Sequence, residues 1–168
     1  MKKKIIILSF SFSFLLTSSQ TVTTIAGNGS CGFANGNGTM ASFNGPSGIC
    51  MDASGSIYVM DQGNGLVRKI TSSGIFSSFV NIVGMACGIC SDPSGNLYVA
   101  GTQSRRIYKV TPTGSVSLFA GGGQYGCVNG TGTLALFGYP VGICSDPLGN
   151  IYVADLGCNS VRKNICRC

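Results

Sequence analysis

The sequence predicts an all-β fold built from repeated four-stranded sheets. Three observations lead to this prediction: a fourteen-residue motif occurs three times, β-type runs flank each copy, and glycine is abundant, with 26 in 168 residues. Charged residues form only 10% of the chain, against about 25% in an ordinary soluble domain. Because glycine favours turns over helix interiors, the composition indicates short strands joined by many turns.

The repeated motif aligns without gaps in its three copies, and seven of the fourteen columns are identical. The copies are GICMDASGSIYVMD at 48–61, GICSDPSGNLYVAG at 88–101 and GICSDPLGNIYVAD at 142–155. A basic β-type run follows each copy, at 66–71, 106–111 and 160–165. Another β-type run precedes each copy, at 22–27, 75–80 and 116–121. A period near 40 residues indicates an array of one supersecondary unit.

Each unit reads as four short strands, typified by GIC-x-D, IYVAD, VRKI and VTTIAG. The second is almost continuously apolar, which is typical of a strand covered on both faces. We expect three strands of each type, in repeats at about 22–71, 75–111 and 116–165. Radial stacking of such four-stranded meanders gives a β-propeller; a β-sandwich and a β-solenoid fit the period less well.

An Asp-x-x-Gly turn joins the first two strands of each unit. Aspartate favours the first turn position because its carboxylate accepts nearby backbone N–H groups, and glycine adopts the positive φ at the end. The predicted structural turn residues are Asp52 and Gly55, Asp92 and Gly95, and Asp146 and Gly149.

These residues resemble the NHL-repeat family of β-propellers. The resemblance lies in Pro-x-Gly-Ile-x-x-Asp at 46–52 and 140–146, in Gly-Asn-Ile-Tyr-Val-Ala-Asp at 149–155, and in Val-Arg-Lys at 67–69 and 161–163. It covers 22–165 and implies a partial β-propeller of about three four-stranded NHL-type blades. The family includes RNA-binding modules, extracellular sensor domains and a few lyases or lactonases, so the fold alone does not give the function.

Three blades are fewer than the four to eight of a closed ring. Two blade faces and the unpaired strand edges would stay exposed, which is a liability for aggregation. Three solutions are open: a fragment of a longer propeller, two copies that form a six-bladed ring, or an open arc capped by loops and disulfides.

The first nineteen residues read as a secretory signal peptide. Lys2, Lys3 and Lys4 precede an apolar run at 5–16, and small residues follow, with cleavage expected after Ser19. The run is too short to cross a bilayer core of about 30 Å; an uncleaved N-terminal anchor is the alternative. We expect an extracellular domain at 20–168 with no membrane span, and cleavage lowers the net charge from +6 to +3.

The chain contains no histidine and no glutamate. This excludes Ser-His-Asp and Cys-His catalysis and histidine-containing zinc sites. The five aspartates, at 52, 61, 92, 146 and 155, all fall in the repeat register, and we interpret them as turn and strand-end residues, a hard-cation site being the alternative. We therefore predict no catalytic residue, no metal and no cofactor, and a secreted non-catalytic binding module. The alternatives are a propeller enzyme of the lyase or lactonase type, or a truncated piece of a longer NHL protein.

Nine cysteines suit an oxidising compartment. Cys127 and Cys158 fall in loops expected on the same side of the third unit, so we predict a disulfide between them. Cys50, Cys90 and Cys144 share one column and are interpreted as core residues, with a ring of thiols that binds a soft metal as the alternative. Cys87 and Cys90 form a Cys-x-x-Cys that leads into a strand, whereas a redox motif needs a helix N-terminus.

The long loops at 26–46 and 120–140 are rich in glycine and contain three Asn-x-Ser/Thr sequences, at Asn28, Asn37 and Asn129. These are candidate N-glycosylation sites. Basic pairs recur at 68–69, 105–106 and 162–163; neighbouring strand residues face opposite sides, so we interpret them as solvated strand residues. The expected partner is a protein or a glycan, with self-association to complete the propeller as a further expectation, and no nucleic acid.

Overall fold

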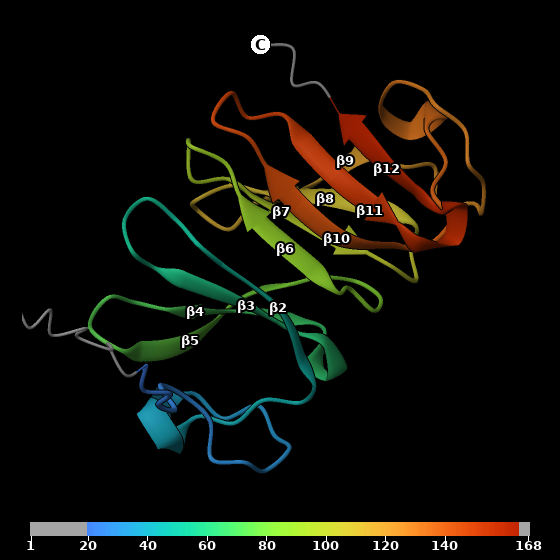
Figure 1. Ribbon diagram of the computed structural model, residues 1–168. Coiled ribbons are helices and arrows are strands. Elements are labelled where there is room, and N and C mark those ends of the chain that lie inside the picture. The colour runs from blue at the N-terminus through green and yellow to red at the C-terminus, as the bar shows by residue number, and fades with distance from the viewer. Residues whose placement is uncertain (1–19, 165–168) are drawn as a thin grey trace, which may run out of the picture.

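The computed structural model describes residues 20–164, which form three antiparallel sheets stacked as an open fan (Figure 1). This confirms the predicted all-β, partial propeller. The predicted signal peptide at 1–19, and Cys166 and Cys168, lie outside the described residues. Among residues 20–164, no helix is long and apolar enough to cross a membrane.

We call the sheets blades 1, 2 and 3. Blade 1 contains β2 (Pro46–Met51), β3 (Ile57–Asp61), β4 (Leu66–Ile70) and β5 (Ile75–Asn81), with the two-residue β1 (Gly36–Asn37) beside β5. Blade 2 contains β6 (Gly88–Ser91), β7 (Leu97–Gly101), β8 (Arg106–Val110) and β9 (Val116–Ala120). Blade 3 contains β10 (Pro140–Ser145), β11 (Ile151–Asp155) and β12 (Ser160–Asn164). Each blade is a meander of sequential antiparallel strands.

The first strands of the three blades, β2, β6 and β10, lie side by side at the centre of the fan (Figure 1). Glycine permits this close approach: a Cβ at Gly48 would collide with the Cys87 carbonyl oxygen, and one at Gly88 with the Val141 carbonyl oxygen. At Gly142 a Cβ would meet only Ala154 of its own blade, at 3.4 Å. The glycine of the repeated motif therefore sets the spacing between consecutive blades.

Apolar side chains fill the two junctions between blades. The core between blades 1 and 2 includes Tyr58, Met60, Val67, Leu97 and Val99. The core between blades 2 and 3 includes Tyr98, Ala100, Ile107, Ile151, Val153 and Phe137. All five residues of β7 are buried, as the prediction of a strand covered on both faces requires.

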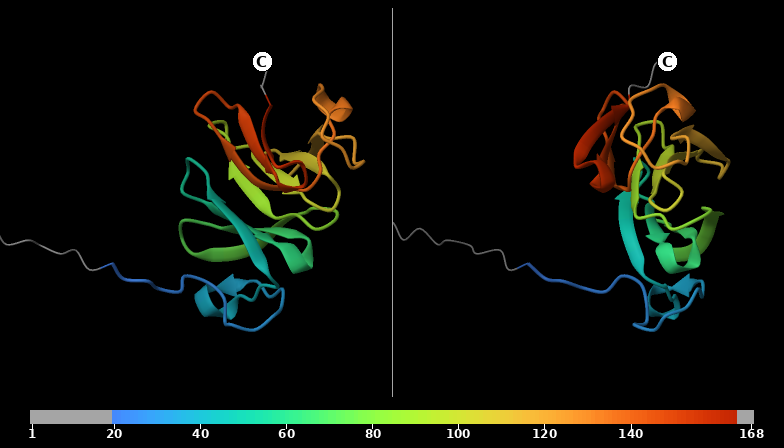
Figure 2. Two further views of the ribbon diagram at one scale, coloured as in Figure 1. Left: turned by 45° about the vertical axis from the view of Figure 1, so that its right-hand side comes forward. Right: turned by 90° about the vertical axis from the view of Figure 1, so that its right-hand side faces the viewer.

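The expected strand at 22–27 is wrong for this structure. Residues 21–26 pair with no strand, and Figure 2 shows this segment, in blue, running away from the blades. Val22 is 96% exposed and Ile25 58% exposed. The reason is topological: the run that precedes each motif pairs with the blade before it, as β5 pairs with β4 and β9 with β8. Residues 22–27 precede blade 1 and so find no such partner in the described chain.

Candidate functional site

A fully buried ion pair fastens the first long loop to blade 1. Arg68 donates from Nη1 to Asp61 Oδ2 at 3.0 Å, and neither side chain is exposed. The same guanidinium donates to the carbonyl oxygens of Ser42 and Ala34 and to Asn35 Oδ1. Each loop group that it contacts is an acceptor, so Nη1 and Nη2 are both paired, whereas the buried Nε has no hydrogen-bond partner among the described residues. The interpretation of this arginine as a solvated strand residue is therefore wrong.

The same arrangement holds the second long loop to blade 3. Arg162 pairs with Asp155 at 3.5 Å. It also donates to the carbonyl oxygens of Leu136 and Val128 and to Asn129 Oδ1. Its side chain keeps 13% of its surface exposed, so this pair is more accessible to water than the pair in blade 1.

Blade 2 has a different pair of residues in these two columns. Gly101 takes the place of the aspartate and Tyr108 that of the arginine, and a Cβ at Gly101 would come within 2.8 Å of the tyrosine ring. The connection that enters blade 2, between β5 and β6, is also short, at residues 82–87. The ion pair thus occurs where a long loop occurs, which identifies it as a loop anchor.

A second contact joins each long loop to the turn that precedes the third strand of its blade, which is β4 in blade 1 and β12 in blade 3. In blade 3 it is the disulfide between the predicted partners Cys127 and Cys158, whose Cα atoms lie 5.6 Å apart. In blade 1, Asn64 occupies the column of Cys158 and donates from Nδ2 to the Gly32 carbonyl oxygen at 2.8 Å. The covalent bond and the hydrogen bond perform the same positioning task.

A cluster of one half-buried arginine and two exposed tyrosines lies where blades 2 and 3 meet. The Arg105 guanidinium carbon lies 5.9 Å from the ring centroid of Tyr125 and 5.6 Å from that of Tyr139. The two ring centroids are 6.0 Å apart. Tyr125 is 57% exposed and Tyr139 43% exposed. Their geometry satisfies cation–π contacts and leaves both rings available at the surface. We call these three residues the Arg-Tyr cluster.

The fold holds the Arg-Tyr cluster in place from three directions. Arg105 sits in the β7–β8 turn with φ at +57°, a conformation that few non-glycine residues adopt. The Tyr125 hydroxyl donates to the Gly157 carbonyl oxygen at 3.0 Å. The backbone N–H of Tyr139 donates to Asp155 at 2.9 Å. The loop anchor and the cluster therefore share a carboxylate.

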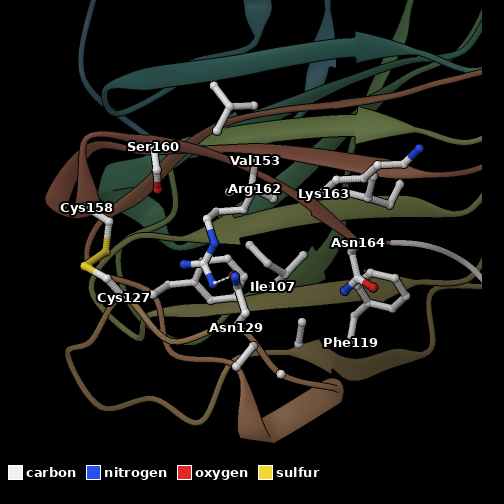
Figure 3. Close-up of a pocket in the computed structure, with 16 residues that line it drawn as sticks. Ile107, Phe119, Cys127, Asn129, Val153, Cys158, Ser160, Arg162, Lys163 and Asn164 are labelled. Atoms are coloured by element: carbon white, nitrogen blue, oxygen red, sulfur yellow. Dashed lines mark hydrogen bonds between the residues drawn. A yellow bond between two sulfur atoms is a disulfide. The ribbon is translucent and has the colours of Figure 1, made fainter.

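A groove of about 650 Å³ runs beside β12, at the outer edge of blade 3 (Figure 3). Ile107 and Phe119 of blade 2 line one side, and Val153, Arg162 and Asn164 of blade 3 line the other. Figure 3 shows the Cys127–Cys158 disulfide at one end of this groove.

The predicted turn residues all lie in β-turns. Asp52 Oδ1 accepts the backbone N–H groups of Ser54 and Ser56, and Asp92 and Asp146 accept the equivalent groups. Gly55, Gly95 and Gly149 have φ values of 79° to 81°. The turn hydrogen bonds shape the acidity: although desolvation raises the pKa of Asp52, bonds from Ser54, Ser56 and Tyr58 together lower it.

Asp146 shows the same effect at the third turn. The side-chain hydrogen bond from Asn150 is the largest cause of its lowered pKa. Within residues 20–164, no group of three or more His, Cys, Asp or Glu side chains is placed to hold a metal ion.

A family model described as NHL repeat matches residues 43–70 and 137–162. These two segments are NHL repeats. Each begins at a phenylalanine of the long loop and contains one complete loop anchor, Asp61 with Arg68 or Asp155 with Arg162. The NHL repeats of blades 1 and 3 are therefore the two that carry long loops. No curated protein matches the chain significantly.

Solved structures with the same fold have varied functions. A gluconolactonase from Xanthomonas campestris matches with a TM-score of 0.56 and 16% identity over 67% of this chain and 35% of its own. Virginiamycin B lyase from Staphylococcus aureus matches with a TM-score of 0.53 and 16% identity over 73% and 42%. The nidogen/laminin complex matches with a TM-score of 0.58 and 18% identity over 74% and 44%. These likenesses show the β-propeller fold, and the chain spans less than half of each matched structure.

The three cysteines of the repeated motif, Cys50, Cys90 and Cys144, lie on the central strands. Cys90 is buried, Cys50 half-buried and Cys144 exposed. Burial raises the pKa of Cys50 and of Cys90 to about 12, so both thiols stay protonated at neutral pH. Cys87 accepts a hydrogen bond from Gln62 at 3.5 Å, and Cys31 is exposed.

The three candidate glycosylation sites, Asn28, Asn37 and Asn129, are all exposed. Asn28 and Asn129 use their side-chain oxygens to accept hydrogen bonds, from the Ser30 backbone and from Arg162. Glycosylation at these positions stays a prediction.

Sequence reasoning missed the Arg-Tyr cluster. Tyr125 and Tyr139 stand in columns that Cys31 and Gly45 occupy in the first NHL repeat. The two long loops match in length and in glycine pattern but differ at these columns. That difference was the sequence signal that could have revealed the cluster. At these two columns the third repeat has an exposed tyrosine and the first repeat does not, so the tyrosines are not required by the fold of the repeat.

Proposed function

We propose that the chain is exported and acts outside the cell as a non-catalytic binding module, with the Arg-Tyr cluster as its contact for a protein partner. The signal-type sequence at 1–19 and the Cys127–Cys158 disulfide support export. The observation that carries the binding proposal is the contact of Arg105 with the exposed rings of Tyr125 and Tyr139.

The chemistry of the Arg-Tyr cluster favours a protein partner. Arginine and tyrosine are enriched among the residues that dominate binding energy at protein interfaces. The Tyr125 side chain is held by its hydroxyl hydrogen bond and the Tyr139 backbone by its N–H bond to Asp155, and a preordered group loses less entropy on binding. The nidogen/laminin complex, in which a similar fold takes part in a protein complex, gives general support.

Self-association belongs to the same proposal, because the end blades leave apolar surface uncovered. Val161 of blade 3 is 77% exposed, whereas Val67 of blade 1 and Ile107 of blade 2, in the same column, are buried. Ile49 of blade 1 is 64% exposed, whereas Ile89 of blade 2 is buried. Val161 faces the side on which a following blade of a ring would pack, and Ile49 faces the side on which a preceding blade would pack.

Site-directed capture tests the binding proposal. The purified chain is immobilised and exposed to medium and detergent-solubilised cell-surface protein from the source organism, and bound proteins are identified by mass spectrometry. We expect a protein that binds the native chain and is lost with Tyr125→Ala and with Tyr139→Ala. The matched control is Leu148→Ala, an exposed side chain at the β10–β11 turn, which should retain it.

Two outcomes would replace the proposal. Binding that survives both tyrosine variants would remove the Arg-Tyr cluster from the interface. Turnover of glucono-δ-lactone by the purified chain, above that of a heat-denatured sample, would favour the enzyme reading. Export is tested separately: the N-terminus of the protein recovered from the medium should be Gln20.

A further inference from the structure

We propose that residues 22–26 of a second copy form the missing outer strand of blade 3, in the groove beside β12. The inference rests on the self-association proposed above and names the strand and the register by which it occurs. No described strand pairs with the outer edge of β12, whereas β4 and β8, which occupy the same place in blades 1 and 2, each pair with an outer strand.

The groove has the place and the lining that an outer strand requires. It lies between β12 and the outer part of blade 2, and its lining includes the half-buried Phe119 and the buried Ile107, Ile151 and Val153. The edge of β12 offers backbone donors and acceptors, which an added strand can satisfy. Figure 3 shows the groove running along β12 from Cys158 toward Asn164.

The segment 22–26 occupies the position, relative to the loop that follows it, that the outer strand β9 occupies relative to its own loop, but no described blade lies beside it. After β9, Gly121 N–H donates to Gly132 O, and Gly126 N–H donates to Phe137 O. After 22–26, Gly27 N–H donates to Gly38 O, and Gly32 N–H donates to Phe43 O. Each of these partners is displaced by 94 residues, so the two loops share these two hydrogen bonds, and 22–26 enters its loop as β9 enters its own.

The known registers predict how the added strand would pair. In blade 1, Lys69 lies opposite Ser77, and in blade 2, Lys109 lies opposite Ser117. The equivalent residues are Lys163 of one copy and Thr23 of the second copy. A small hydroxyl residue thus faces a lysine in all three blades.

The next position of the register agrees. Arg68 lies opposite Ser78 in blade 1, and the equivalent pair is Arg162 with Thr24 of the second copy. Blade 2, which has Tyr108 in place of the arginine, has Leu118 opposite it. The residue opposite is polar in each blade with an arginine and apolar in the blade with a tyrosine.

The bulged residue of the outer strand supplies a third agreement. Phe79 packs on Tyr58 with ring centroids 5.4 Å apart, and Phe119 packs on Tyr98 at 4.8 Å. Both bulges fall at a register shift in the pairing with the preceding strand. Ile25 of the second copy stands at this position and would pack on Tyr152, over which Lys163 already lies at 5.2 Å.

Reciprocal exchange closes the assembly. Each copy gives its 22–26 segment to blade 3 of the other, and each blade 3 then packs on the exposed Ile49 side of the other blade 1. Two copies related by a two-fold axis give six blades, within the range of closed propellers.

Light scattering on the purified chain tests the exchange. We expect twice the chain mass at micromolar concentration, and a dimer dissociation constant raised about tenfold or more by Ile25→Asp. Val83→Asp is the matched control, since Val83 is an exposed apolar residue outside the exchanged segment, and it should leave the constant unchanged. A circular dichroism spectrum identical to that of the native chain shows that each variant is folded.

Disulfide trapping tests the register. Thr23→Cys with Lys163→Cys should give a crosslink between two chains, located by mass spectrometry of the joined peptides. Thr24→Cys with Lys163→Cys, which is displaced by one residue and directs the thiols to opposite faces, should give much less. If the chain is a dimer but the Thr23→Cys, Lys163→Cys pair forms no crosslink and Ile25→Asp does not weaken the dimer, the strand exchange is overturned. The proposal of self-association is then retained. A monomer at all concentrations would overturn both and leave the Arg-Tyr cluster untouched.

Discussion

Arg68, in the middle of β4, and Asp61, at the end of β3, form an ion pair with no solvent exposure on either side chain. The Arg68 guanidinium also contacts the long loop 26–46 through the Ser42 and Ala34 carbonyl oxygens. Because removing one member of a buried ion pair leaves an uncompensated buried charge, the loop, the carboxylate and the guanidinium depend on one another.

The first prediction concerns the loss of that guanidinium. Arg68→Ala leaves the Asp61 carboxylate buried without its cation, and removing one partner of a buried pair costs about 3–5 kcal/mol. The free energy of unfolding, measured by urea titration, should fall by roughly that amount. Arg162→Ala should cost less, because its ion pair is longer and partly exposed; equal losses would contradict the difference in burial.

The second prediction concerns acid stability. Asp52 and Asp146 have lowered pKa values in the folded chain. A group whose pKa is lower when folded contributes stability above its unfolded pKa, and the contribution is lost as the pH falls through the folded value. The unfolding midpoint should therefore hold from neutral pH to about pH 4, near the ordinary aspartate pKa, and fall below it. Asp52→Asn with Asp146→Asn should flatten this fall; an unchanged acid limb would place its origin elsewhere.

The third prediction concerns the disulfide. Cys127 and Cys158 are 31 residues apart in sequence, and closing a loop of that length stabilises by roughly 3–4 kcal/mol in the chain-entropy model. Cys127→Ser with Cys158→Ser should lower the free energy of unfolding by that order and weaken capture through the adjacent Arg-Tyr cluster. Cys31→Ser, at an exposed free cysteine, is the control and should change neither quantity.

Periodicity accounts for what the sequence could predict. The motif strands, the Asp52-type turns and the pairing of Cys127 with Cys158 depend on register within one unit, and register is visible in aligned columns. The burial of Arg68 was not visible, because its acceptors are backbone carbonyls of a glycine-rich loop. The unpaired state of 22–26 was missed because the residues themselves favour a strand, while a strand also needs a neighbour.

The fourth prediction tests whether the glycine of the repeated motif is needed for packing against the neighbouring blade or for the conformation of its own strand. A Cβ at Gly88 would collide with the Val141 carbonyl oxygen, whereas one at Gly142 meets only Ala154, at the 3.4 Å of ordinary contact. Gly88→Ala should therefore lower the free energy of unfolding by about 1–3 kcal/mol, the usual cost of overpacking. Gly142→Ala should leave it unchanged when measured at a concentration where the chain is monomeric. The two positions share one column of the motif, so equal effects would mean that the glycine serves the strand itself. Unequal effects mean that it serves the neighbouring blade, and Gly142→Ala should then weaken dimer formation alone.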